Sequence, residues 1–154
     1  LGVFGGFLHD DGGGTVRRGF GREPLVTYRM AKKDKAVLPR LMQVMAEIWF
    51  AAGAKEVFLP VLGLGGVTPD RLRSLDLAAI KGRDLECGSQ HPLGTCRMGP
   101  DKSHAVVDAW GECFELEGCT IADGSVVPTS LGVNPQLTIM TMALRIARHL
   151  AESA

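Results

Sequence analysis

The sequence predicts a mixed fold of helices and short strands, of the α+β or α/β class, from three observations. Two short runs with β character, residues 15–18 and 25–30, are separated by glycine and proline residues and predict a hairpin. Apolar residues with helical spacing occupy residues 37–52 and predict a helix. A second helical pattern follows residue 134 and is apolar on most sides, so we expect that helix to be buried in a large assembly.

The composition is that of a folded protein and excludes several classes. Of the 154 residues, 45% are hydrophobic and 22% are charged, which is unlike a disordered chain. The net charge is zero and the basic residues are scattered, so no nucleic-acid partner is expected. No apolar run approaches the roughly 20 residues of a membrane span, and the first residues lack the basic start of a signal peptide. We therefore expect a cytoplasmic protein with reduced cysteines, and the missing initiator methionine indicates a piece of something longer.

The central helix has a clear end and an ambiguous start. Asp34 is a suitable N-cap, and Gly53 follows the last apolar residue, where glycine commonly ends a helix. Pro39 lies too deep for a helix that is capped at Asp34. Two alternatives stay open: helical bonding begins near Val37, or the first turn is distorted.

A glycine-rich stretch follows the apolar residues 56–62, which form a strand candidate. Residues 63–68 superficially suggest the Gly-x-Gly-x-x-Gly loop that binds dinucleotides, but Thr68 occupies the position of the third glycine. Pro60 also interrupts the preceding strand. We therefore predict a turn here, followed by a short helix near residues 70–80.

Further short strands and a helix start are predicted in the last third of the chain. Residues 106–108 and 112–117 predict a second hairpin, and residues 119–122 a strand that ends at Asp123 and Gly124. Asn134 as N-cap and Pro135 as first helical residue predict the start of the final helix. Basic residues in its last turns complement the helix dipole.

Three motifs in this region resemble, in order and spacing, the C-terminal signature of the glucose-methanol-choline (GMC) family of FAD-dependent alcohol oxidoreductases. Residues 91–99 have the pattern His-x-x-Gly-Thr-Cys-x-Met-Gly, residues 122–125 read Ala-Asp-Gly-Ser, and residues 134–135 are the Asn-Pro that opens the last helix. Residues 110–118 and 128–135 resemble most the long-chain alcohol oxidase and cholesterol oxidase branches, which suggests an apolar, bulky alcohol.

The resemblance implies a particular place in a two-domain flavoprotein. Residues 1–86 would be the end of an antiparallel-sheet substrate domain. Residues 87–154 would be the C-terminal segment, with the catalytic loop and the last strand and helix of the FAD-binding domain. The loop that grips the ADP part of FAD is missing, so the N-terminal FAD-binding half is an expected partner and the isolated piece is expected to be inactive.

The resemblance also implies roles for His91 and Asn134. His91 would accept the hydroxyl proton of the alcohol while hydride leaves for the flavin, and Asn134 would pair with it on the substrate oxygen. We therefore expect the two side chains to lie near one another. On the residues alone, a histidine in a stiff loop suits a general base, but a structural loop histidine and a simple N-cap are the alternatives.

The cofactor contacts implied by the family lie at two places. Asp123 and Gly124 would lie near the ribityl and pyrophosphate groups of FAD, with a simple turn after a strand as the alternative. The helix start would face the pyrimidine edge of the flavin, where free N–H groups and the helix dipole stabilise negative charge. The residues of the helix start assigned to the cofactor are Asn134, Pro135, Gln136 and Thr138.

Three other functions compete with this prediction. A zinc site would use the cysteines with His91, but the spacings Cys-x3-His-x4-Cys and Cys-x5-Cys match no common ligand pattern. A serine hydrolase would use Ser125 or Ser130, but the chain has no Gly-x-Ser-x-Gly motif. The third alternative is a non-catalytic binding or interaction domain that keeps the fold without an FAD clamp.

Overall fold

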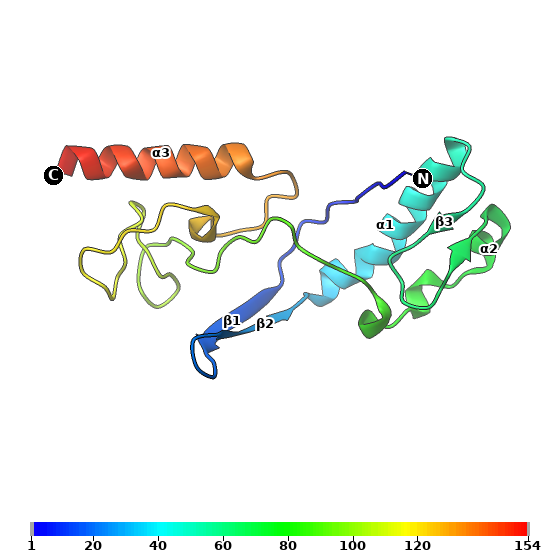
Figure 1. Cartoon of the computed structure of the whole chain (residues 1–154), viewed down its shortest axis with the longest axis horizontal. Helices are drawn as coiled ribbons and strands as arrows, with labels where there is room; N and C mark the ends of the chain where they lie inside the picture. Colours follow the sequence, from blue (N-terminus) through cyan, green and yellow to red (C-terminus); the bar gives the residue numbers. More distant parts are fainter. Residues whose placement is uncertain (1, 154) are drawn as a thin grey trace. The chain divides into compact units, whose positions relative to one another are not determined.

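The computed structural model describes residues 2–153, and these divide into two units that we describe separately. The first, here called the α1 unit, consists of the described residues up to Leu8 together with Met30–Gly88. The second, the α3 unit, consists of His9–Arg29 together with the described residues from Ser89 onward. Figure 1 shows the elements along the chain.

Helix α1 (Lys32–Ala51) buries one face, with Leu38, Met42 and Ala46 spaced four residues apart. It begins earlier than predicted: Ala31 occupies the N-cap position without a side-chain hydrogen bond, and its carbonyl accepts from Lys35 N–H at 3.0 Å. The prediction of Asp34 as N-cap was therefore wrong, and Asp34 is instead buried within the first turn.

Pro39 lies inside α1, so helical bonding does not begin near Val37. Because proline has no N–H, Pro39 cannot donate to the carbonyl of Lys35, and the helix continues past this missing bond. The predicted end is confirmed. Gly53 has a φ of +92° and donates to the carbonyl of Phe50, while Ala54 donates to that of Trp49.

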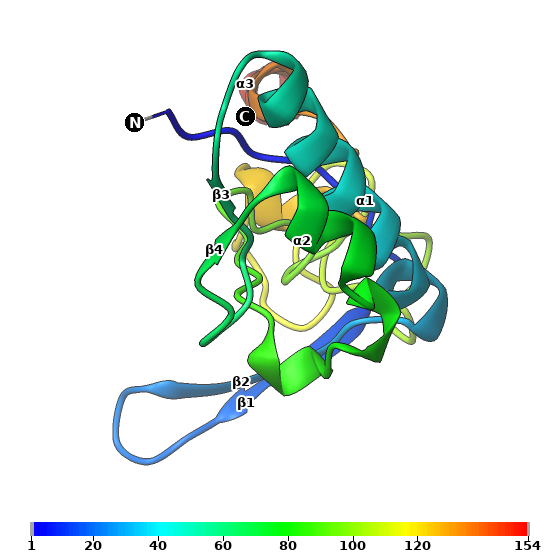
Figure 2. The same cartoon turned by 90° about the vertical axis from the view of Figure 1, so that its right-hand side faces the viewer.

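The rest of the α1 unit forms a small hairpin and short helical turns (Figure 2). Strands β3 (Val57–Phe58) and β4 (Gly66–Val67) pair antiparallel. The glycine-rich stretch thus contains the predicted turn, within a hairpin that the sequence did not predict. The strand predicted over residues 56–62 is only two residues long. Ala46, Val57 and Val67 form the buried core of this unit.

The helix predicted near residues 70–80 is divided in two. Helix α2 (Pro69–Ser74) is capped by Thr68, whose hydroxyl accepts from Arg71 N–H at 3.3 Å. Asp76 then caps a separate 3₁₀ turn, η1 (Leu77–Ala79), which packs against α1. Aspartate side chains that bind nearby backbone N–H groups favour such breaks. A further 3₁₀ turn, η2 (Gly82–Asp84), follows.

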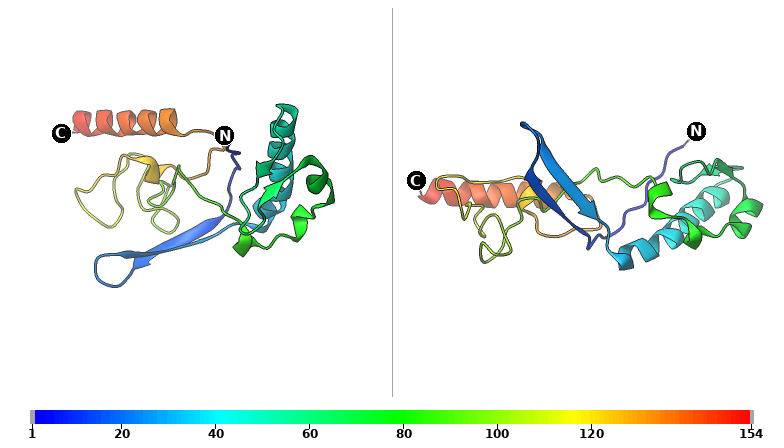
Figure 3. Two further views of the ribbon diagram at one scale, coloured as in Figure 1. Left: turned by 45° about the vertical axis from the view of Figure 1, so that its right-hand side comes forward. Right: turned by 90° about the horizontal axis from the view of Figure 1, so that it is seen from below.

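The predicted N-terminal hairpin is present in the α3 unit. Strands β1 (Gly13–Arg18) and β2 (Pro24–Arg29) form an antiparallel ribbon (Figure 3). Thr15 lies opposite Thr27 in their register. Every residue of both strands is exposed. The Tyr28 hydroxyl donates to Asp10 Oδ2 at 2.7 Å, which ties the segment before β1 to β2.

The strands predicted at 106–108, 112–117 and 119–122 do not form, and only single bridges join these segments. The side chain of Asp108 accepts from the N–H groups of Trp110 and Glu112, which closes a tight turn in place of a ladder. Gly111 and Gly118 have φ of +81° and +69° and introduce further turns. Only one or two backbone hydrogen bonds therefore form between the segments before the chain turns away. The prediction of extended strands here was therefore wrong.

Helix α3 (Gln136–Ser153) begins one residue later than predicted. Its first bond runs from Ile139 N–H to the carbonyl of Pro135 at 2.9 Å, so Pro135 takes the capping position predicted for Asn134. Arg145, Arg148 and His149 lie in the second half of α3 as predicted, but the described part of the final turn contains no basic residue. Ile146 anchors it in a core with Val107 and Val126.

The mixed α+β class is confirmed in this general form, with short antiparallel sheets and helices. Within residues 2–153, no helix is both long enough and apolar enough to cross a membrane.

Candidate active site

The three motifs all lie in the α3 unit, and backbone hydrogen bonds join the first two. Cys96 N–H donates to the carbonyl of Ser125 at 3.0 Å, and Met98 N–H donates to that of Val126 at 2.9 Å. The loop that carries His91 therefore runs beside the turn that carries Asp123 and Gly124.

Gly124 is the point where this pair of segments meets helix α3. A Cβ at this position would lie 3.0 Å from Ile139 Cδ1 on α3 and 3.3 Å from Leu93 Cδ2 on the His91 loop. A larger residue would push at least one of these side chains aside. A small residue fits at position 124 because Leu93 and Ile139, from two other segments of the chain, pack around it.

His91 is exposed. Its N–H donates to Ser89 Oγ at 3.3 Å, which closes a local turn that ends at His91. Three residues later the backbone of Gly94 has a φ of +77°, and a Cβ there would lie 3.3 Å from the carbonyl oxygen of Val127. Both features favour glycine at position 94. The loop after His91 is thus held by its backbone conformation as well as by hydrogen bonds.

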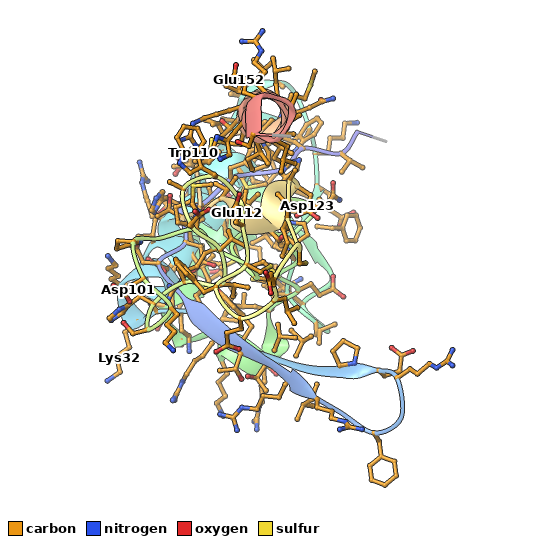
Figure 4. All side chains as sticks on the ribbon, turned by 90° about the vertical axis from the view of Figure 1, so that its left-hand side faces the viewer. Lys32, Asp101, Trp110, Glu112, Asp123 and Glu152 are labelled. Carbon is orange, nitrogen blue, oxygen red and sulfur yellow. The ribbon has the colours of Figure 1, made fainter. Side chains whose placement is uncertain are left out.

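Asp123, labelled in Figure 4, caps the 3₁₀ turn η3 (Gly124–Val126). Its Oδ1 accepts from Ser125 N–H at 2.7 Å. Hydrogen bonds from the Ser125 side chain and backbone lower the pKa of Asp123 below its usual value, and partial burial opposes them. Asp123 is therefore a carboxylate at neutral pH. This local role matches the turn that the sequence left as an alternative.

The start of α3 presents the remaining predicted cofactor residues. Asn134, Gln136 and Thr138 are exposed, whereas Pro135 is buried. The first N–H groups of a helix have no partner within it, so the backbone of Gln136 and Thr138 offers donors for an anionic group. These residues are compatible with the electron-rich edge of a reduced flavin.

Sequence reasoning missed His9. Gly132, in the loop that enters α3, has a φ of +65°, and a Cβ there would lie 3.6 Å from His9 Cβ. The imidazole Nδ1 of His9 is also 3.8 Å from Asp11 Oδ1. More than one hundred residues separate His9 from the helix start, so no local sequence pattern could have placed it there.

Two surface hollows lie on the α3 unit, and neither is lined by His91 or Asn134. One, of about 390 Å³, is lined in part by Trp110, Arg145 and His149. The rings of Trp110 and His149 stack with centroids 4.3 Å apart, and the Arg145 guanidinium lies 4.1 Å from the Trp110 ring. These contacts hold the 108–112 turn against α3.

The zinc alternative finds no support in the part of the chain that the structure describes. Among residues 2–153, no three His, Cys, Asp or Glu side chains come close enough together to hold a metal ion.

Comparisons with known proteins agree with one another on the family. Residues 22–143 match the family model described as GMC oxidoreductase. An uncharacterised GMC-type oxidoreductase of Sinorhizobium fredii is 34% identical over 148 residues, which cover 95% of this chain and 29% of the relative. A long-chain-alcohol oxidase of Arabidopsis thaliana is 31% identical over 166 residues, covering 94% of this chain and 20% of the relative.

A solved structure shows the same fold. The crystal structure of pyridoxine 4-oxidase from Mesorbium loti superposes with a TM-score of 0.69 and 24% identity, covering 94% of this chain and 28% of that one. The chain thus spans less than a third of the length of each of these proteins. The predicted family is confirmed: this chain belongs to the GMC oxidoreductases, whose members use FAD, and corresponds to their C-terminal domain.

Proposed function

We propose that this chain is the C-terminal part of an FAD-dependent oxidoreductase that oxidises an alcohol, with His91 as the base. The observation that supports this most is that the first two motifs lie side by side at Gly124, where Ile139 of the helix opened by the third motif also packs. In this proposal residues 87–154 contribute the catalytic loop and the last helix of the FAD-binding domain, and residues 1–86 the end of the substrate domain. The ADP clamp is supplied by sequence that this chain does not contain.

The proposed roles follow from the chemistry of each side chain. The imidazole of His91 accepts the hydroxyl proton of the alcohol. The Asn134 amide donates to the same oxygen and orients it, which requires its side chain to lie near His91. Bound FAD would supply the acceptor for the hydride that leaves the alcohol carbon. Holding the oxygen between two side chains fixes the direction in which that hydride departs.

The residues toward the cofactor act through charge and backbone donors. The donors at the start of α3, near Asn134, Pro135, Gln136 and Thr138, would stabilise negative charge on the flavin ring of bound FAD. The carboxylate of Asp123 would accept a hydrogen bond from the ribityl group of bound FAD, and Gly124 lets that turn pack against Ile139 of α3. The substrate is an apolar or bulky alcohol, a proposal supported by the similarity to a long-chain-alcohol oxidase.

Replacing His91 in the holoenzyme tests the catalytic assignment. In a complete enzyme that contains this chain, His91→Ala is expected to slow reduction of the flavin by alcohol by about 10² to 10⁴, the usual contribution of a positioned base. The FAD content after desalting should stay unchanged, because the cofactor is held mainly by other residues. Stopped-flow absorbance of the flavin measures the rate.

His104→Ala is the matched control, since His104 is another exposed histidine of the α3 unit, bound locally to Ser103. It should reduce flavin at the normal rate. An unchanged rate in His91→Ala removes His91 from the mechanism. Loss of FAD from His91→Ala, with little change in the rate for the flavin that remains, would make His91 a cofactor ligand instead.

A further inference from the structure

Cys113 and Cys119 face one another across a short antiparallel pair of segments in the α3 unit. Cys113 N–H donates to the carbonyl of Cys119 at 2.9 Å, and Ile121 N–H donates to that of Gly111 at 2.8 Å. The single bridge between Glu112 and Thr120 sets the same register. Counting one residue on from this bridge in each segment places Cys113 directly opposite Cys119.

This register brings the two side chains together. Directly opposed residues in an antiparallel pair have Cα atoms about 4.5–5.5 Å apart and point to the same face. A disulfide needs Cα atoms roughly 4.4–6.8 Å apart, and the separation typical of directly opposed residues falls within this range. Both cysteines are free and half-buried, and both line one hollow of about 380 Å³ together with Leu116 and Thr120.

The thiols also interact in the reduced state. Burial raises the pKa of Cys113, and a hydrogen bond with the Cys119 thiol raises it further. Cys96 is near enough to add a smaller electrostatic effect. By contrast, Cys87 is exposed and belongs to the α1 unit.

We propose that Cys113 and Cys119 form a reversible dithiol–disulfide pair, a redox modification site that reacts with low-molecular-weight disulfides such as oxidised glutathione. One thiolate attacks the reagent, forms a mixed disulfide and releases one glutathione thiolate. The second cysteine then attacks the protein sulfur of that mixed disulfide and releases the second glutathione. Two protein thiols are oxidised, one reagent disulfide is reduced to two thiols, and the two thiol protons pass to the released glutathione thiolates.

The expected consequence is local. Cys113 packs against the core of Val107, Val126 and Ile146. The disulfide would therefore restrict the motion of the 114–118 loop relative to that core. The proposal does not depend on the proposed catalytic function, because it concerns thiols that the mechanism does not use.

Thiol mapping in the full chain tests the pair. The folded chain is equilibrated with defined ratios of reduced and oxidised glutathione, quenched with acid, alkylated, and mapped by peptide mass spectrometry. The peptide that contains both cysteines should lack both thiol hydrogens and carry neither alkyl group nor glutathione. Cys113→Ser and Cys119→Ser should each leave a glutathione adduct on the remaining cysteine, because no second thiol can displace it.

Two controls make the test specific to the folded geometry. Cys87→Ser should behave like the unmodified chain. In urea, the equilibrium constant for closing the disulfide should fall at least about tenfold, because unfolding removes the antiparallel register. Equal constants in folded and unfolded chain would overturn the proposal. The proposal would also be overturned if Cys113 and Cys119 stayed reduced, and were therefore alkylated, at glutathione ratios that already glutathionylate Cys87. A disulfide from either cysteine to Cys96 would overturn it too.

Discussion

At the scale of single residues, Asp123 has a local role that can be separated from any role toward a cofactor. Its carboxylate accepts from Ser125 N–H and begins the turn that packs Gly124 between Leu93 and Ile139. A change at Asp123 therefore affects the turn first. An effect of a substitution on flavin binding can be assigned to the charge of Asp123 only if the variant still forms this turn.

Asp123→Ala is expected to destabilise the α3 unit by about 1 kcal/mol, the usual effect of losing a capping side chain. Asp123→Asn should change stability little, because asparagine caps almost equally well and the exposed charge itself contributes little. Urea unfolding of the two variants measures the difference. Equal losses in both variants would mean that the charge, and not the cap, carries the stabilisation.

The pH dependence has a defined sign. Because the folded pKa of Asp123 lies below its usual value of 3.8, its stabilisation is present above that value and is lost as the pH falls through the lower folded pKa. NMR titration of the carboxyl carbon should show this lowered pKa. Ser125→Ala should move the pKa back toward the usual value, because the Ser125 side chain is its largest cause.

At the scale of elements, helix α3 is attached by a narrow stripe of buried surface. Ile146 is fully buried against Val107 and Val126, whereas Leu137 is 78% exposed and Leu144 is 53% exposed. A helix that is apolar on several sides but buries so little of itself has a large apolar surface left uncovered. Its stability therefore depends on very few side chains.

Ile146→Ala should destabilise the α3 unit by about 2–5 kcal/mol, because it leaves a cavity in the small core. Leu144→Ala, on the same helix, should cost far less, since that side chain is already half in solvent. Thermal unfolding followed by the helical circular dichroism signal compares the two. Similar losses from both changes would show that the exposed face of α3 is covered in solution.

At the scale of the whole molecule, both units expose large apolar side chains. They include Phe58 and Ile48 in the α1 unit and, in the α3 unit, Leu25, Val26, Leu137 and Met140. The related proteins are several times longer than this chain, and the sequence contains no Gly-x-Gly-x-x-Gly loop for the pyrophosphate of FAD. Exposed apolar patches of this kind favour association.

The chain by itself should therefore bind FAD weakly and self-associate. After incubation with excess FAD and desalting, the visible spectrum should show little flavin, and size-exclusion chromatography should show species larger than a monomer. Adding a separately produced FAD-binding half of a GMC relative should reduce the association. A stoichiometric flavin band on a monodisperse monomer would contradict the proposal that the clamp lies elsewhere.

The sequence alone determined the features that depend on neighbouring residues. The hairpin of β1 and β2 follows from β-forming runs around glycine and proline, and the end of α1 follows from Gly53. The three GMC motifs were also readable in order, because they are short and contiguous. The family prediction rested on these local patterns, and the comparisons confirmed it.

Tertiary structure decided the features in which distant residues compete with local preference. Helix α1 begins before Asp34 and continues through Pro39, because burial of Leu38, Met42 and Ala46 outweighs one missing hydrogen bond. The strands expected between residues 106 and 122 give way to turns closed by Asp108 and two glycines. The packing at Gly124 and the position of His9 come from segments far apart in sequence, whose contact depends on the folded chain and leaves no local pattern.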